Sequence, residues 1–184
     1  MKLITKRLIL RQITKKDAKA LVENINNIKV SRYLLLVPYP YTMKDAKWWI
    51  NQCIKLSKEK PKKGYEFTIE LKAEKKLIGG IAIGHIDNFQ GKATIGYWLG
   101  EKYWRQGIGS EALKKIIDFS FTKLKLRRLE ASAFRENKAS IRLQEKHGFR
   151  REGIKMESCR SKATGKIHDE IRCGLLKKNY GIKK

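Results

Sequence analysis

Two glycines near the middle of the chain are spaced so that main-chain amides around them could bind an anion. The segment Trp104-Arg105-Gln106-Gly107-Ile108-Gly109-Ser110 follows a strand-like run, 93–99, and precedes apolar residues spaced by three and four, which predicts a helix. The first N–H groups of a helix have no acceptor and lie at the positive end of its dipole. Because glycine has no Cβ, a phosphate can approach the backbone here, and Arg105 can add positive charge at the rim.

Two other phosphate-binding loops do not fit this segment. A dinucleotide fingerprint requires a third glycine at position 112, where the chain has Ala112. A nucleoside-triphosphate loop requires Gly-Lys followed by Ser or Thr, which is also missing. On its own, a single Gly-x-Gly would more often be an ordinary turn.

A second polar group stands at the start of another predicted helix. Asn137-Lys138-Ala139-Ser140 is followed by Glu145-Lys146-His147-Gly148-Phe149, in which Gly148 is a typical helix stop. Asn and Ser are common helix caps, so capping alone would explain Asn137.

Together the two segments resemble the acyl-CoA site of the GNAT superfamily of N-acetyltransferases. The loop pattern Gln/Arg-x-x-Gly-x-Gly/Ala falls on residues 104–109, except that Trp104 stands where Gln or Arg is usual. That tryptophan, with Gly96-Tyr97-Trp98 before the loop and the opening Thr5-Lys6-Arg7-Leu8-Ile9-Leu10-Arg11, resembles the RimJ/RimL branch of ribosomal-protein acetyltransferases. The resemblance covers nearly the whole chain and implies acetyl-CoA as the acyl donor.

The resemblance also implies which residues bind this cofactor. They lie on the strand before the loop, in the loop and at the start of the later helix: Tyr97, Trp98, Leu99, Trp104, Arg105, Gln106, Gly107, Ile108, Gly109, Ser110, Asn137 and Ser140. The main chain of Tyr97 to Leu99 is expected to hydrogen-bond the cofactor, and Leu99 to donate to the oxyanion of the intermediate.

The implied reaction is direct acyl transfer from a thioester to an amine through a tetrahedral intermediate. Many members place a proton-donating tyrosine seven residues after the asparagine, but this chain has Gln144 there, which cannot act as an acid. Ser140 therefore becomes the candidate for protonating the leaving sulfur, with a structural contact as the alternative. Glu130 is the first candidate for the general base, although it could simply offset Arg127 and Arg128.

The elements that must position these residues can be read along the chain. Alternation and β-branched composition predict seven strands, at 5–11, 65–71, 77–85, 93–99, 128–134, 149–159 and 167–176. Apolar spacing and caps predict four helices, ending at about Asn26, Leu56, Leu124 and Gly148. The resemblance implies one α/β domain over residues 1–184, with a mixed, mostly antiparallel sheet that is splayed between its fourth and fifth strands.

Charge is the outstanding bulk property of the chain. Lys and Arg number 43 against 18 Asp and Glu, a formal net charge of +25. Such an excess favours an anionic partner such as a ribosome or another nucleic acid, or it reflects compositional bias alone. Tyr33, Tyr39, Tyr41 and Trp48 could contact an acceptor but are more typical of core residues.

Several classes of protein are disfavoured by the sequence. Three cysteines without paired spacing and three scattered histidines, His85, His147 and His168, indicate neither a disulfide framework nor a metal site. No apolar run is long enough to span a bilayer, and the first residues do not resemble a signal peptide. We therefore expect a cytoplasmic protein, monomeric or homodimeric, without metal or membrane contact.

The acceptor predicted first is the N-terminal amine of a protein, most plausibly a ribosomal one. A small-molecule acceptor, such as an aminoglycoside or a polyamine, remains an alternative. A basic nucleic-acid-binding module that retains a vestigial acyl-CoA site is the third reading of the sequence.

Overall fold

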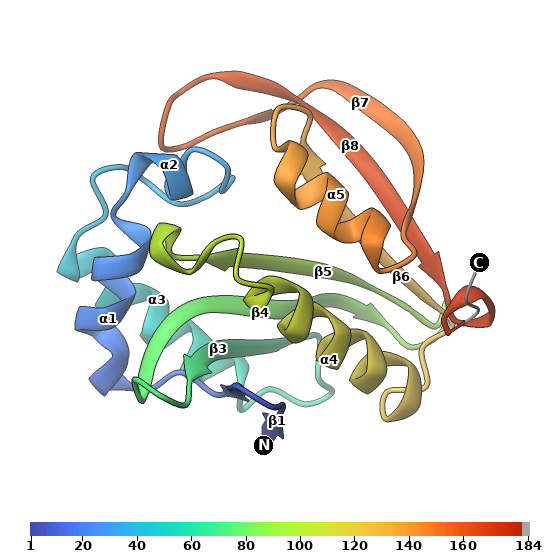
Figure 1. Ribbon diagram of the computed structural model, residues 1–184, viewed down its shortest axis with the longest axis horizontal. Coiled ribbons are helices and arrows are strands. Elements are labelled where there is room, and N and C mark those ends of the chain that lie inside the picture. The colour runs from blue at the N-terminus through green and yellow to red at the C-terminus, as the bar shows by residue number, and fades with distance from the viewer. Residues whose placement is uncertain (182–184) are drawn as a thin grey trace.

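A sheet of eight strands runs through residues 1–181, the part of the chain that the computed structural model describes (Figure 1). Its strands lie in the order β1-β2-β3-β4-β5-β6-β8-β7. Their bounds are β1 Lys2–Ile4, β2 Leu8–Arg11, β3 Tyr65–Leu71, β4 Lys76–Asp87, β5 Lys92–Leu99, β6 Arg128–Phe134, β7 Arg150–Arg160 and β8 Ile167–Leu176. Only β5 and β6 are parallel neighbours, so the predicted mixed, mostly antiparallel sheet is confirmed.

The additional strand comes from the N-terminus, where one strand over 5–11 was predicted. The chain instead forms a hairpin of β1 and β2 with a turn at Thr5–Arg7. The Thr5 amide donates to the Leu8 carbonyl at 3.0 Å, and the Leu8 amide donates to Thr5 Oγ1 at 3.0 Å. This side-chain bond competes with continued pairing and reverses the chain.

Five α-helices accompany the sheet: α1 Ala18–Ile25, α2 Ile28–Ser31, α3 Met43–Leu56, α4 Ile108–Thr122 and α5 Lys138–Lys146. Four of them are the predicted helices. The fifth, α2, is a single turn at the start of the expected connector, capped by Asn27, whose side chain accepts from the Lys29 amide. A capping box of Thr42 and Asp45 begins α3, one of the helices predicted from spacing and caps.

The two faces of the sheet are covered unequally. One face packs against α4 and α5 through a large core that includes Leu113, Ile116, Ile117 and Ile141. The other face packs against α1 and α3 at its β2–β4 end, through Leu21 and Ile50 among others. Figure 1 shows these two helices gathered at that end, so the rest of this face, called the open face below, has no helix over it within the described residues.

The sheet parts between β5 and β6. The two strands pair from Lys92 with Arg128 to Ile95 with Ala131, and no register continues beyond that pair. The last four residues of β5, Gly96–Leu99, and the end of β6 therefore diverge. This is the splay that the sequence resemblance implied.

The β7–β8 hairpin extends beyond the sheet toward the segment that follows α2 (Figure 1). The Lys162 amide at its tip donates to the Leu35 carbonyl at 3.0 Å, and Ser161 beside it is fully buried. The hairpin and the α2–α3 connector thus close one end of the open face. Among residues 1–181, no helix combines the length and apolarity needed to cross a membrane.

Candidate active site

The N-terminus of α4 has the geometry of an anion site. Gly107 caps the helix in the left-handed conformation, with φ at +73°, which a residue with a side chain adopts only with strain. The first intrahelical bond runs from the Glu111 amide to the Gly107 carbonyl at 3.0 Å. Within the described chain, the amides of Ile108, Gly109 and Ser110 have no acceptor.

Gly109 is required for a different reason. A Cβ at this position would lie 3.3 Å from Leu143 Cδ2 and 3.4 Å from Leu99 Cδ1. The glycine therefore lets the first turn of α4 pack between the end of β5 and α5. The helix N-terminus consequently faces the splay.

The remaining loop residues brace the loop or project from it. The Trp104 indole donates to the Leu99 carbonyl at 2.8 Å, which ties the loop to the end of β5. The Gln106 side chain donates to the Lys102 carbonyl at 2.7 Å. Arg105 has a φ of +59° and is exposed, so its guanidinium is free to meet an anion.

A clasp that the sequence analysis missed holds this loop to the N-terminal hairpin. Glu111 in the first turn of α4 accepts from Thr5 Oγ1 at 2.5 Å, from the Arg7 amide at 2.8 Å and from Arg7 Nε at 2.7 Å. Arg7 Nη1 also donates to the Gln106 carbonyl at 2.9 Å. Although burial disfavours the ionised form, the bonds from Thr5 and Arg7 leave the pKa of Glu111 below its usual value. The Thr5-Lys6-Arg7 opening predicted a strand and supported the family resemblance. It gave no indication that Thr5 and Arg7 bind Glu111.

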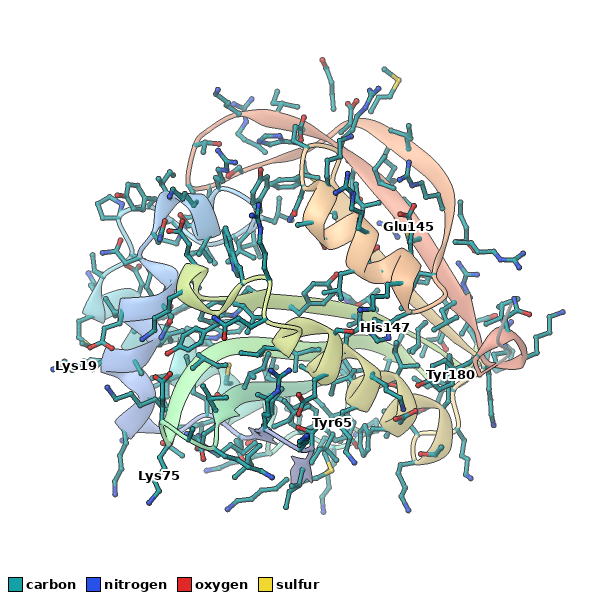
Figure 2. All side chains as sticks on the ribbon, viewed as in Figure 1. Lys19, Tyr65, Lys75, Glu145, His147 and Tyr180 are labelled. Atoms are coloured by element: carbon teal, nitrogen blue, oxygen red, sulfur yellow. The ribbon has the colours of Figure 1, made fainter. Side chains whose placement is uncertain are left out.

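Helix α5 is tied to α4 through Ser110 of α4. Its hydroxyl lies 2.8 Å from His147 Nε2, and Figure 2 shows His147 between α5 and α4. Burial, reinforced by the charges of Lys146 and Lys114, lowers the pKa of this imidazole. His147 is therefore neutral at physiological pH and serves as a hydrogen-bonding partner.

Inside the splay, Tyr97 of β5 reaches Ser140 of α5. The two hydroxyl oxygens are 3.0 Å apart, and Tyr97 also donates to the Ser140 carbonyl at 3.2 Å. Gln144 Nε2 donates to Ser140 Oγ at 3.3 Å, while Gln144 Oε1 is buried without a partner in the described chain. Burial raises the pKa of Tyr97, so its phenol stays protonated. Sequence reasoning had assigned only the main chain of Tyr97 to the site.

The main chain of Leu99 faces the gap. The Gly100 amide donates to Ile78 of β4, and backbone groups alternate in direction along a strand. The Leu99 N–H therefore points away from β4, toward the side where β6 has diverged. The Trp98 side chain lies on the other face, where its Nε1 would be 2.6 Å from a Cβ at Gly80.

Asn137 caps α5, since its side-chain oxygen accepts from the Ser140 amide at 3.1 Å. The capping explanation for this residue is therefore satisfied, and its Nδ2 has no partner among residues 1–181. Asn137 thus lies beside Ser140, and a role for it in binding the cofactor stays a prediction.

Glu130 lies at the closed end of the splay. It pairs with Thr94 in the parallel register, and its Oε1 accepts from Arg128 Nε at 2.9 Å. Arg128 also bonds Glu152. The ion pair that the sequence offered as an alternative is present, while a role for Glu130 as a base stays a prediction.

The other aromatic candidates divide between core and surface. Tyr41 is 5% exposed and belongs to the core under α1 and α3, whereas Trp48 is 60% exposed on α3. Tyr39 is also exposed, and Tyr33 accepts a hydrogen bond from Arg32.

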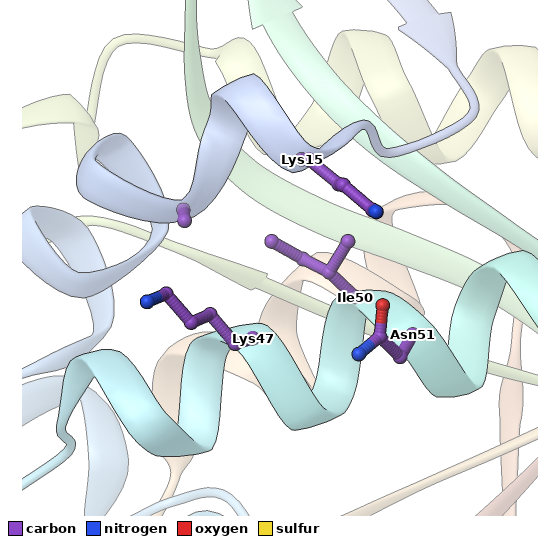
Figure 3. A pocket seen from close by; sticks show the side chains of 5 residues that line it. Lys15, Lys47, Ile50 and Asn51 are labelled. Carbon is purple, nitrogen blue, oxygen red and sulfur yellow. The ribbon is translucent and has the colours of Figure 1, made fainter.

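A pocket of about 240 Å³ lies outside the splay, between the start of α1 and α3 (Figure 3). Its lining is Lys15, Ala18, Lys47, Ile50 and Asn51. No cluster of three or more His, Cys, Asp or Glu within the described residues could hold a metal ion.

The splay fits a phosphorylated thioester. Free amides and Arg105 at the start of α4 suit a diphosphate, the diverging strands leave main-chain groups for an extended amide-containing arm, and Ser140 supplies a hydroxyl near its end. A Cβ at Gly107 would also fall 3.5 Å from Arg7 Nη2. Arg7 is therefore a second cation, in addition to Arg105, near the anion site at the start of α4.

Comparison with known proteins points to the same chemistry. Residues 7–150 match the model of the acetyltransferase (GNAT) domain. The chain is 35% identical to the uncharacterized N-acetyltransferase p20 of Bacillus licheniformis over 97% of each protein. It is 34% identical to the ribosomal-protein-serine acetyltransferase of Escherichia coli, over 50% of this chain and 51% of that protein.

Two solved structures show the same fold. A putative ribosomal-protein-serine acetyltransferase from Vibrio cholerae superposes with a TM-score of 0.77 at 28% identity, covering 96% of this chain and 97% of that one. The spermidine N-acetyltransferase from Vibrio cholerae, in complex with CoA and spermine, gives 0.78 at 23% identity, covering 96% and 99%.

Replacing Gly109 by Glu tests the loop. The glutamate side chain would crowd Leu99 and Leu143 and would place a negative charge at the anion site. We expect acetyl-CoA affinity to fall by about 100-fold or more, that is, by about 2.7 kcal/mol in calorimetry. Gly153→Glu adds the same charge on β7, where a Cβ has nothing within 4 Å, and should bind normally. Wild-type affinity in a folded Gly109→Glu variant would refute the loop assignment.

Replacing Glu111 by Gln tests the clasp. The change removes a charged acceptor from Thr5 and Arg7, so the free energy of unfolding in urea should fall by about 2 kcal/mol at pH 7. Because the folded-state pKa is lowered, the difference should shrink as the pH falls below the ordinary value of 4.5.

Lys114→Gln is the matched control for the clasp, because it breaks an exposed i,i+4 pair with Asp118 on the same helix. It should cost no more than about 0.5 kcal/mol. Equal stability of the two variants would show that the clasp contributes nothing.

Proposed function

Because the chain belongs to the acetyltransferase (GNAT) family, we propose that it acetylates the N-terminal amine of a protein. It is an N-acetyltransferase whose acyl donor is acetyl-CoA. The acceptor is the N-terminus of a ribosomal protein, and the reaction takes place in the cytoplasm.

The observation that carries the proposal is the splay, with Tyr97 and Ser140 bridging it. The choice of acceptor is supported by the relatives named ribosomal-protein-serine acetyltransferases. The net charge of +25 also favours a target bound to ribosomal RNA over a free polycation. The free thiols of Cys53, Cys159 and Cys173 support a reducing compartment.

The residues of the splay supply what acyl transfer needs. Acetyl-CoA provides the activated acyl group. The Leu99 N–H, aimed into the gap, would donate to the oxyanion of the tetrahedral intermediate. Ser140, which receives a hydrogen bond from Gln144, can turn its own proton toward the leaving sulfur, and the protonated phenol of Tyr97 can replenish it.

A panel of amines tests the choice of acceptor. The protein should be incubated with acetyl-CoA and, separately, with peptides beginning with Ser or Ala, ribosomal proteins, spermidine and an aminoglycoside. We expect mass spectrometry to find one added acetyl group on the α-amine of peptides or ribosomal proteins. Turnover confined to spermidine or the aminoglycoside would overturn the proposed acceptor, although the enzyme class would stand.

Replacing Ser140 by Ala tests its role in catalysis. If the hydroxyl protonates sulfur, kcat should fall by about 100-fold with little change in the dissociation constant of acetyl-CoA. Ser120→Ala is the control, because Ser120 is a buried serine on α4 that bonds only the Ile116 carbonyl. Parallel losses of kcat and affinity in Ser140→Ala would indicate a binding role instead.

A further inference from the structure

The residues of the splay do not explain where the acceptor amine loses the proton that it carries at neutral pH. An α-amine has a pKa of about 8, so at neutral pH it arrives mainly as an ammonium ion. Over the reaction its nitrogen gives up two protons as the N–C bond forms and the C–S bond breaks. One proton ends on the sulfur of CoA, and the other must leave the site.

Glu66 of β3 lies on the face of the sheet that α1 and α3 partly cover, in a row of residues that leads to the splay. It pairs with Ala82 of β4, and Ala82 pairs with Gly96 of β5. Residues paired across a sheet project from the same face, so Glu66, Ala82 and Gly96 form one row. Neighbouring strands are about 4.8 Å apart, which places Gly96 about 10 Å from Glu66.

No large side chain of this row stands between Glu66 and Gly96. Gly96 is exposed, and a Cβ built on it would meet nothing within 4 Å. Ala82 is the only side chain in the row between the two residues, and it is small and partly exposed. Gly96 is also the first residue after β5 and β6 stop pairing. A short chain of water molecules could therefore connect the carboxylate to an amine entering the splay.

Glu66 differs from the other carboxylates of this face because nothing neutralises it. Glu70 pairs with Arg11, Glu130 with Arg128, and Glu170 with Arg172. Within residues 1–181, the Glu66 carboxylate has neither a hydrogen bond nor an ion pair, and its oxygens are not wholly enclosed.

The surroundings of Glu66 tune it for accepting a proton. The group that faces it from α3 is the Cys53 thiol, whose pKa is raised to about 12 by burial and by the Glu66 charge, so the thiol is neutral. Its cross-strand partner on β4 is Ala82, which does not titrate. Burial raises the pKa of Glu66 to about 7, within the range where a carboxylate can both take up and release protons at neutral pH.

We propose that Glu66 accepts, through water, the proton that the acceptor amine loses, and passes it to solvent. The ammonium gives H⁺ to the carboxylate, and the neutral amine then attacks the thioester carbonyl. The second N–H proton accounts for the one that CoA sulfur gains. This inference rests on the proposed amine acetylation and assigns to Glu66 the role for which Glu130 was the first candidate.

The test is the pH profile of Glu66→Gln beside Glu130→Gln and Glu23→Gln, with an Ala-starting peptide as acceptor. Glu23 is an exposed glutamate on α1 and serves as the control for the same change of charge. We expect Glu66→Gln to lower kcat by about 100-fold at pH 7 and to remove the fall in kcat below about pH 7. Acetyl-CoA affinity should be unchanged, and Glu66→Asp should recover part of the rate.

A second readout uses an acceptor peptide whose N-terminal NH₂ belongs to a hydrazide group and is therefore already neutral at pH 7. The defect of Glu66→Gln should shrink by about 10-fold or more with this acceptor, because no ammonium has to be deprotonated. A purely structural role would not discriminate between the two acceptors. The folding control is thermal unfolding at pH 8, where removal of a partly buried charge should leave the midpoint at or above that of the wild type.

Three results would overturn the inference: a wild-type pH profile in Glu66→Gln, loss of the acidic limb in Glu130→Gln instead, or an equal loss with both acceptors. The proposed function fails separately. If the wild type acetylates a small amine but no peptide, the same variants are compared with that amine, and the role of Glu66 is decided there.

Discussion

The structure depends on the point at which β5 and β6 stop pairing. A parallel pair that continued past Ile95 and Ala131 would satisfy its own main chain and leave no room for a ligand. Because the strands diverge, the Leu99 N–H faces a gap, and the first turn of α4 is directed at the same gap by the close packing of Gly109 on Leu99. Unsatisfied backbone groups from two elements thus converge on one place, and they need the amide and phosphate groups of a ligand to replace the missing strand.

Side-chain hydrogen bonds fix the positions of the elements around the gap. On the α4 side, Glu111 fastens the loop to Thr5 and Arg7 of the N-terminal hairpin. Across the gap, Tyr97 hydrogen-bonds Ser140. The first contact is partly buried and charged, which makes its loss costly, while the second joins groups that also have chemistry to perform. These bonds therefore position α4 and α5 at the gap and place a hydroxyl within it.

The sequence predicted what depends on local pattern. The helix that follows the glycine turn, the capped start of α3 and the strands from β3 onward follow from spacings within about ten residues, and all are present. What it missed depends on long-range contacts. The partner of Arg7 lies 104 residues away, so no local pattern identifies it. The extra strand β1 arose because the Thr5 hydroxyl bonds Leu8 and interrupts an otherwise regular alternation.

Glu66 shows why the choice among carboxylates could not be made from the sequence. Every strand glutamate looks alike in a chain with 43 Lys and Arg, since each has a cation nearby in the sequence or on a neighbouring strand. Three-dimensional register decides which of them is neutralised: Arg128 reaches Glu130, and Arg11 reaches Glu70, but no arginine shares the row of Glu66. The Glu66 carboxylate is partly buried and has no cationic partner, even in so basic a protein. Its ionised form is therefore costly to maintain. That cost is what makes it a better acceptor of protons than its paired neighbours, whose charge is already stabilised by arginine.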